Sequence, residues 1–181
     1  MSHISFFNGK FIPTNDVSLN LLDNFLTVVR GYQVFTFLKT TNQGQPIFLD
    51  HQINRVFNNV DKMKMEIEES KGDVKSLVLE TLKKNDCSKQ ECNIMITVLV
   101  GKTGDSSGLI PAHPTRLLIF ITPSRKHPEE FYINGISVGL IEHARSNADI
   151  KSPMTYGPAL LAQNTLAKDG AYHEILYTDK G

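Results

Sequence analysis

Residues 148–157 read Ala148-Asp149-Ile150-Lys151-Ser152-Pro153-Met154-Thr155-Tyr156-Gly157, directly before an apolar run with helical spacing. Lys151 follows an isoleucine and precedes Ser-Pro, and Asp149 is the one carboxylate near it. Burial disfavours the ammonium form of lysine, so an amine held in such a place can condense with an aldehyde. Taken alone, the stretch favours the other interpretation, an ordinary loop lysine at the surface.

The size and charge of the chain exclude several classes of function. Its 181 residues, 40% of them hydrophobic, suffice for one large or two small domains. The 19 basic and 19 acidic residues cancel, so nothing indicates a nucleic-acid or membrane-surface partner. The N-terminus lacks the pattern of a signal peptide, and no apolar run is long enough to span a bilayer. We therefore expect a soluble cytoplasmic protein.

Two patterns that suggest ligand sites are better explained otherwise. Cys87 and Cys92 have no second cysteine pair or nearby histidine to complete a zinc site, so we expect reduced structural thiols rather than metal ligands or a disulfide. The six histidines are scattered, which argues against a metal site. Gly101-Lys102-Thr103 copies the end of a phosphate loop, but the first glycine of that motif would fall on Ile96, inside a strand.

Hydrophobic periodicity predicts mixed helices and strands. The helix that starts at His51 has its core face at Ile53, Val56, Phe57, Val60 and Met63, and a second helix over 74–84 turns Val74, Leu77, Val78 and Leu82 inward. The predicted strands are a hairpin over 5–13, then 28–40 (a strand, or a short turn leading into one), 47–49, 93–100, 116–122, 136–142 and 172–178, with a third helix over 157–168. We expect an N-terminal α/β domain over 1–122, an interdomain linker over 123–134 and a second domain over 135–181.

Five short motifs follow one another along the chain. They are Phe7-Asn8-Gly9-Lys10-Phe11, Arg30-Gly31-Tyr32-Gln33-Val34-Phe35, Leu49-Asp50-His51-Gln52-Ile53-Asn54-Arg55, Asp149-Ile150-Lys151-Ser152 with Tyr156, and Gly170-Ala171-Tyr172-His173-Glu174-Ile175-Leu176. In this order the chain resembles the class IV, fold-type IV pyridoxal-phosphate (PLP) enzymes, which include branched-chain aminotransferases, D-amino acid aminotransferases and aminodeoxychorismate lyases. The resemblance overturns the surface-loop interpretation of Lys151.

The resemblance implies a fold and a set of roles. The fold is α+β with two domains, an N-terminal α/β sandwich and then the start of a C-terminal β-barrel-like domain. Lys151 matches the catalytic lysine that forms the internal aldimine and later moves the α-proton. Arg55 matches the arginine that binds the cofactor phosphate, for which a guanidinium is well suited. Tyr156 matches a tyrosine that hydrogen-bonds the cofactor 3'-oxygen. Without the family context, Arg55 could equally be a solvated helix arginine and Tyr156 a core tyrosine.

The departures from the family pattern carry information. Gln52 stands where the family usually has histidine, with His51 one residue earlier, and Thr36 stands where an acid is usual. Neither change touches the cofactor chemistry directly. Val100 occupies a place where D-amino acid aminotransferases and some lyases have arginine, so the strand ending looks closer to the branched-chain group. Arg30 or Lys102 is then the candidate group for a substrate carboxylate.

The resemblance also bears on the end of the chain. In the family, a strand and turn like residues 177–181 leads into a glutamate that pairs with the pyridine nitrogen, so we expect the C-terminal part to be missing here. Without that partner the cofactor's electron sink weakens. We therefore expect the 181 residues alone to bind PLP poorly and to catalyse little.

The expected function is that of a PLP-dependent enzyme acting on amino acids or 2-oxo acids, most simply an aminotransferase of the branched-chain type and a homodimer like its family. One alternative is a 4-amino-4-deoxychorismate lyase, because the same site supports both reactions. A second alternative is a non-catalytic relative that kept the fold; the changes at Gln52 and Thr36 favour it, and the retention of Lys151, Arg55 and Tyr156 argues against it.

Overall fold

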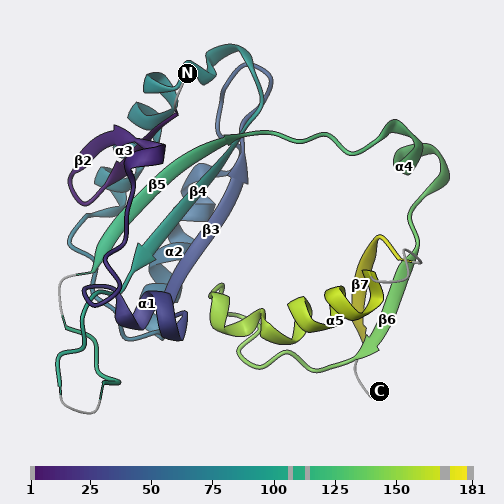
Figure 1. Ribbon diagram of the computed structural model, residues 1–181. Coiled ribbons are helices and arrows are strands. Elements are labelled where there is room, and N and C mark those ends of the chain that lie inside the picture. The colour runs from purple at the N-terminus through teal and green to yellow at the C-terminus, as the bar shows by residue number, and fades with distance from the viewer. Residues whose placement is uncertain (1–2, 106–107, 113–114, 168–171, 179–181) are drawn as a thin grey trace. The chain divides into compact units, whose positions relative to one another are not determined.

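The computed structural model describes residues 3–105, 108–112, 115–167 and 172–178 (Figure 1). The chain divides into two units, one formed by Met1–Ser124 with Ile150–Ser152 and the other by Arg125–Asp149 with Pro153–Gly181. The short segment Ile150–Ser152 therefore belongs to the first unit although it lies between two parts of the second. The mixed α+β class expected from the sequence is confirmed.

A five-stranded sheet forms the framework of the first unit. Its strand order is β2-β1-β5-β4-β3, and all of its neighbouring strands are antiparallel. The strands are β1 (Ile4–Phe7), β2 (Lys10–Pro13), β3 (Gln33–Lys39), β4 (Cys92–Leu99) and β5 (Arg116–Pro123). Strand β3 is thus an edge strand whose one partner in the sheet is β4.

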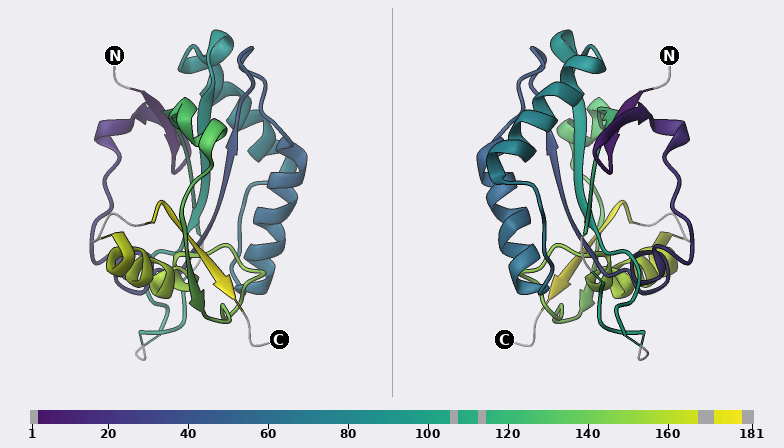
Figure 2. Two further views of the ribbon diagram at one scale, coloured as in Figure 1. Left: turned by 90° about the vertical axis from the view of Figure 1, so that its right-hand side faces the viewer. Right: turned by 90° about the vertical axis from the view of Figure 1, so that its left-hand side faces the viewer.

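Two helices, α2 (Leu49–Lys62) and α3 (Lys71–Lys84), pack on one face of this sheet (Figures 1 and 2). Because strand side chains alternate between faces, every second residue of the central strands enters the core. The buried core contains Val34, Leu38, Ile94, Ile96, Val98, Ile119 and Ile121 from the strands, and Ile53, Val56, Val60, Val74, Val78 and Leu82 from the helices. The predicted core faces of both helices are confirmed.

The first hairpin forms where the Asn-Gly pair predicts it. Asn8 and Gly9 both adopt positive φ, 49° and 79°, which suits a two-residue turn between antiparallel strands. Phe6 and Phe11 face each other across the hairpin, with ring centroids 5.3 Å apart.

Two predicted strands are wrong in part. The strand expected over 28–40 begins later, because residues Phe25–Arg30 form α1 and Gly31, at φ 65°, ends that helix in the left-handed conformation. The strand expected over 47–49 is absent: Phe48 adopts φ 54° and Leu49 begins α2. In both places an apolar residue does enter the core, since Leu26 and Leu49 are buried, but its local structure is helical.

Ser70 and Asp73 form a capping box at the start of α3. The Asp73 N–H donates to Ser70 Oγ over 3.2 Å, and the Ser70 N–H donates to Asp73 Oδ2 over 2.9 Å. These bonds satisfy two of the donors that a helix start leaves unpaired. The helix therefore begins three residues earlier than the predicted 74–84.

In the second unit two strands pair in parallel, and a helix lies between them along the sequence. Strand β6 (Val138–Glu142) pairs with β7 (Glu174–Thr178), and α5 (Gly157–Ala167) follows the 3-10 turn Pro153–Thr155. The first half of this unit also contains α4 (Glu129–Asn134), which the sequence pattern, interpreted as a polar linker, did not predict. Lys168, Gly170, Ala171 and residues 179–181, which the sequence analysis used, lie outside the described residues.

None of the helices within the described ranges is both long and apolar enough to cross a membrane.

The Asp73 carboxylate should make α3 sensitive to acid. Hydrogen bonds from the Ser70 hydroxyl and backbone lower the pKa of Asp73. A carboxyl whose pKa is lowered by folding stabilises the fold above its ordinary pKa of about 3.9, and this contribution disappears as the pH falls through the folded-state value. Urea unfolding between pH 6 and pH 3 should therefore show a smaller loss of stability for Asp73→Asn than for the wild type. Glu68→Gln, an equal change of charge at an exposed loop residue, is the control and should follow the wild type.

Candidate functional site

Lys151 is docked on the outer edge of β3. The Phe35 N–H donates to the Lys151 carbonyl over 3.0 Å, and the Ser152 hydroxyl donates to the Gly31 carbonyl over 3.5 Å. Ser152 is 1% exposed, so the segment is anchored by a buried neighbour as well as by the backbone. The lysine predicted to be catalytic is therefore held by the sheet of the first unit rather than carried on a free loop.

The amine of Lys151 lies over an aromatic ring. Its Nζ is 4.8 Å from the ring centroid of Phe35, a distance at which a cation is attracted to the ring face. The Lys151 side chain is half-buried. This contact gives the amine a defined position beside β3, in contrast to the solvated position of a typical surface lysine.

Arg55 reaches the same strand from α2. Its Nη2 donates to the Thr36 Oγ1 over 2.5 Å, and the Thr36 hydroxyl in turn donates to the Gln52 Oε1 over 2.6 Å. Thr36 is fully buried in the sheet face that α2 covers. Its hydroxyl has one proton, which Gln52 accepts, and a lone pair remains for Arg55. The three side chains form a directional chain that fixes the guanidinium plane.

Two buried donors on this side of α2 have no hydrogen-bond partner among the described residues. They are the Arg55 Nε and, four residues later and so one helical turn on, the Asn59 Nδ2. Thr36 and Gln52 are neutral, and no described carboxylate pairs with Arg55, so its charge is not cancelled. A buried unpaired donor is costly, so the Arg55 Nε is a candidate partner for a hydrogen-bond acceptor other than the described residues.

The structure brings Arg55 and Lys151 to consecutive residues of one strand, on opposite faces. Arg55 contacts Thr36 on the helix-covered face, whereas Lys151 lies over Phe35. Side chains of neighbouring strand residues point to opposite faces, so the two cations lie on opposite faces of β3 at its outer edge, where the Lys151 backbone is bound. A ligand held by both would have to lie at this edge.

Tyr156 belongs to the second unit. It follows the turn Pro153–Thr155, where its N–H donates to the Pro153 carbonyl over 3.0 Å, and its own carbonyl accepts the Leu160 N–H at the start of α5. The Arg145 guanidinium carbon lies 5.2 Å from its ring centroid. Tyr156 is half-buried, and its backbone position is fixed by the start of the helix.

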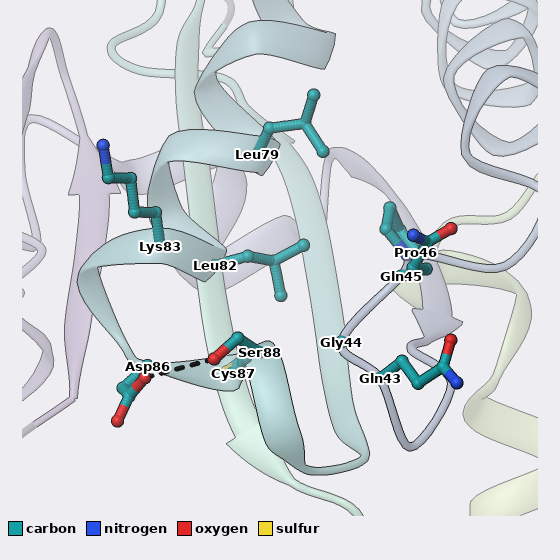
Figure 3. A pocket seen from close by; sticks show the side chains of 10 residues that line it. All are labelled: Gln43, Gly44, Gln45, Pro46, Leu79, Leu82, Lys83, Asp86, Cys87 and Ser88. Carbon is teal, nitrogen blue, oxygen red and sulfur yellow. Dashed lines mark hydrogen bonds between the residues drawn. The ribbon is translucent and has the colours of Figure 1, made fainter.

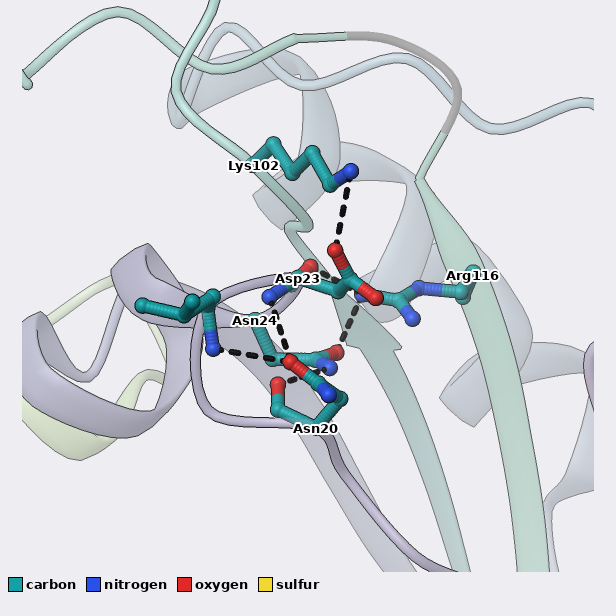
Figure 4. Close-up of polar contacts among 6 residues, drawn as sticks. Asn20, Asp23, Asn24, Lys102 and Arg116 are labelled. Carbon is teal, nitrogen blue, oxygen red and sulfur yellow. Dashed lines mark hydrogen bonds and ion pairs between the residues drawn. The ribbon is translucent and has the colours of Figure 1, made fainter.

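Lys102 is paired with a carboxylate. Its Nζ lies 2.9 Å from Asp23 Oδ1, within a polar network that Figure 4 shows. The Arg116 Nη2 donates to the Asp23 carbonyl over 2.9 Å and also to Asn24 Oδ1. Burial lowers the pKa of Arg116, and Asp23 opposes that shift. This network ties the start of α1 to β5 and to the residues after β4.

Arg30, the other predicted carboxylate-binding residue, is the last residue of α1 and is exposed. Its guanidinium carbon lies 6.0 Å from the Phe25 ring centroid, in the same helix. Arg30 and Lys102 thus have different local partners, one an aromatic ring and the other a carboxylate.

Sequence reasoning missed the partners of Arg55. Thr36 and Gln52 were recognised as departures from a pattern, each taken by itself, and were judged remote from the cofactor chemistry. The structure shows that they contact each other and the arginine. The sequence did contain one signal of this contact. Thr36 and Gln52 depart from the family pattern together, with a hydroxyl where an acid is usual and an amide where a histidine is usual.

The sequence model of the family described as amino-transferase class IV matches residues 33–181, which is most of the chain. The chain belongs to the class IV aminotransferase family. No curated protein sequence matches it.

Solved structures with the same fold support this membership of the class IV aminotransferases. The branched-chain amino acid aminotransferase of Escherichia coli matches with a TM-score of 0.85 at 18% identity, covering 99% of this chain and 60% of that one. A T.th. branched-chain aminotransferase complexed with N-(5'-phosphopyridoxyl)-L-glutamate gives 0.81 at 20% identity, with 99% and 59% covered. That of the archaeon Thermoproteus uzoniensis, solved with norvaline, gives 0.80 at 16%, with 99% and 60% covered. The fold-type IV assignment is thereby confirmed.

The class IV chain described here spans about 60% of the length of the solved structures that it matches. The T.th. enzyme has been solved with pyridoxamine 5'-phosphate and with 4-methylvaleric acid. These ligands belong to that protein.

Removing the Thr36 hydroxyl should destabilise the first unit. In Thr36→Val the shape is kept, but Arg55 Nη2 and Gln52 Oε1 each lose a partner. Leaving such groups unpaired costs about 1–3 kcal/mol of unfolding free energy. Urea denaturation followed by circular dichroism measures the loss, and Thr36→Ser, which keeps the hydroxyl, should lose less. Equal stability of Thr36→Val and the wild type would show that the hydroxyl does not hold the arginine.

Proposed function

We propose that the protein to which these residues belong is a PLP-dependent aminotransferase of the branched-chain type, with Lys151 as its catalytic amine and Arg55 as its phosphate-binding residue. One observation carries the proposal. An unneutralised guanidinium with a buried, unpaired Nε and an anchored lysine amine flank the same edge of β3. The family membership and the fold match support it.

The residues present fit the phosphate group of the cofactor. Arg55 offers its charge and the Nε donor that no described residue uses, while Thr36 holds the Nη2 end of the fork. A guanidinium pairs with phosphate oxygens through parallel N–H donors and keeps its charge at every physiological pH. The Asn59 Nδ2 on the same side of α2 is a second buried donor that awaits an acceptor.

Lys151 supplies the amine. PLP, when bound, provides an aldehyde that a lysine can link to and a ring that takes up electrons from the substrate. Lys151 Nζ would serve first as the attachment point and then as the base that removes the proton from the substrate α-carbon. The hydrogen bond from the Phe35 N–H to the Lys151 carbonyl and the ring beneath the amine orient Nζ for both tasks.

Tyr156 would donate a hydrogen bond to the 3'-oxygen of the cofactor. Its place directly before α5 fixes the backbone from which its side chain extends. Arg30 and Lys102 stay the proposed contacts for a substrate carboxylate, and Lys102 would have to exchange its ion pair with Asp23 to serve in that way. The homodimer implied by the family also stays a prediction.

The branched-chain type is favoured at Val100. This residue directly follows β4, is fully buried, and accepts a hydrogen bond at its carbonyl from Thr27 Oγ1 over 2.6 Å. With valine at position 100, this position offers no positive charge that could bind an additional carboxylate of the substrate.

Reductive trapping tests the roles of Lys151 and Arg55. The 181-residue protein is incubated with PLP, treated with borohydride to fix any link between the aldehyde and an amine, and digested for mass spectrometry. Lys151 should carry most of the pyridoxyl label. PLP should label it at least about tenfold more efficiently than pyridoxal, which lacks the phosphate, because charge-assisted hydrogen bonds contribute about 1.5–3 kcal/mol.

The matched variants are Arg55→Met and, as a control, Arg125→Met at an exposed position. Arg55→Met should erase the preference for PLP over pyridoxal, and Arg125→Met should keep it. Label spread evenly over surface lysines, or equal labelling by the two aldehydes in the wild type, would contradict the assignment.

Parallel assays on the whole protein to which these 181 residues belong test the reaction. Amino-group transfer from leucine, isoleucine or valine to 2-oxoglutarate should exceed pyruvate release from aminodeoxychorismate, and Lys151→Ala should abolish the transfer. Pyruvate release without transfer would replace the aminotransferase proposal by the lyase. If neither reaction occurs and Lys151→Ala has the same absorption spectrum with PLP as the wild type, the protein is a non-catalytic relative.

A further inference from the structure

A buried pair of thiols lies away from the proposed PLP site. Cys87 and Cys92 are each 1% exposed, both are free, and their Sγ atoms are 2.6 Å apart. The two thiols are therefore in direct contact. The sequence predicted reduced structural thiols, and their close approach was not apparent from the sequence.

The backbone on both sides holds the two sulfurs together. Cys92 begins β4, where its N–H donates to the Thr40 Oγ1 over 2.8 Å and its carbonyl accepts the Thr40 N–H over 2.9 Å. Cys87 begins the 3-10 turn Cys87–Lys89, and Gly44 packs against it so tightly that a Cβ at position 44 would lie 2.1 Å from the Cys87 carbonyl oxygen. The backbone of each cysteine is therefore packed against the loop between β3 and α2.

The pair lies next to a cavity. Cys87 lines a cavity of about 550 Å³ between the end of α3 and the loop of residues 43–46 (Figure 3). The polar side chains around it include Gln43, Lys83 and Asp86. The cavity shares no residue with the set around Arg55 and Lys151. A small reagent in this cavity lies beside Cys87 and outside the proposed PLP site.

We propose that Cys87 and Cys92 form a redox-active dithiol that closes into an intramolecular disulfide when a small organic disulfide enters this cavity. The Cys87 thiolate attacks one sulfur of the reagent, whose S–S bond breaks and releases one thiolate that takes up the proton from Cys87. Cys92, losing its proton to solvent, then attacks the Cys87 sulfur of the mixed disulfide and expels the second thiolate, which takes up a proton from solvent. In sum, two protein thiols are oxidised and one reagent disulfide is reduced to two thiols.

The environment makes this pair slow to react at neutral pH. Burial, followed by the hydrogen bond to Cys92, raises the pKa of Cys87 to about 12. Because the thiolate is the attacking species, the pair stays reduced during brief exposure and closes on longer incubation or in mildly alkaline buffer. Once the first bond has formed, the short distance to Cys92 favours closure over release of the reagent.

The test uses the native 181-residue protein and 2-hydroxyethyl disulfide in mildly alkaline buffer, with acid quenching and intact mass spectrometry. The expected product has lost two hydrogens, carries no adduct, and yields a Cys87–Cys92 cross-linked peptide on digestion. It should unfold at a higher temperature than the reduced protein, and dithiothreitol should reverse the shift. Cys92→Ser should instead accumulate the mixed disulfide at Cys87.

Other outcomes would overturn the proposal. One is a wild-type product with stable adducts on one or both cysteines and no cross-link, because the sulfurs would then be unable to meet. Another is a native protein that keeps both thiols while the urea-unfolded chain reacts, because the cavity would then give no access. Both readouts are independent of PLP and of any transferase activity, so they separate this proposal from the one for Lys151 and Arg55.

Discussion

The hydrogen bond between the Phe35 N–H and the Lys151 carbonyl is the contact on which the arrangement of the candidate site depends. It joins the segment Ile150–Ser152 to β3, an edge strand that lies much earlier in the sequence. This segment belongs to the first unit. An edge strand offers unpaired backbone groups, and here one of them fixes the position of the lysine. The chemistry proposed for Lys151 therefore rests on the sheet more than on the loop around it.

Arg55 is held by two neutral side chains. The Thr36 hydroxyl and the Gln52 amide form a continuous hydrogen-bonded chain with its guanidinium. Because both partners are neutral, the positive charge stays available for an external anion. The same two changes that favoured a non-catalytic relative on sequence grounds are consistent with an anion-binding arginine held in one orientation.

Much of the fold follows from local patterns, and the errors have local causes. The Asn8-Gly9 turn and the apolar faces of α2 and α3 were predictable, because turn chemistry and helical periodicity act within a few residues. The missed helix α1 and the false strand at 47–49 depend on Gly31 and Phe48 in the left-handed region, which hydrophobicity does not reveal. For the site, the resemblance could name Lys151, Arg55 and Tyr156, whereas contacts such as Thr36 with Arg55 and Cys87 with Cys92 join residues through the tertiary fold.

The outer edge of β3 is occupied at two points. Lys151 accepts from Phe35, and the Ile47 N–H donates to the Lys39 carbonyl at the end of the same strand. An edge strand with unpaired backbone groups and apolar side chains, such as those of β3, can pair with a strand of another molecule and start aggregation. The two contacts reduce the number of backbone groups available for such pairing. The lysine-bearing segment thus covers part of a strand edge that could otherwise pair with another chain.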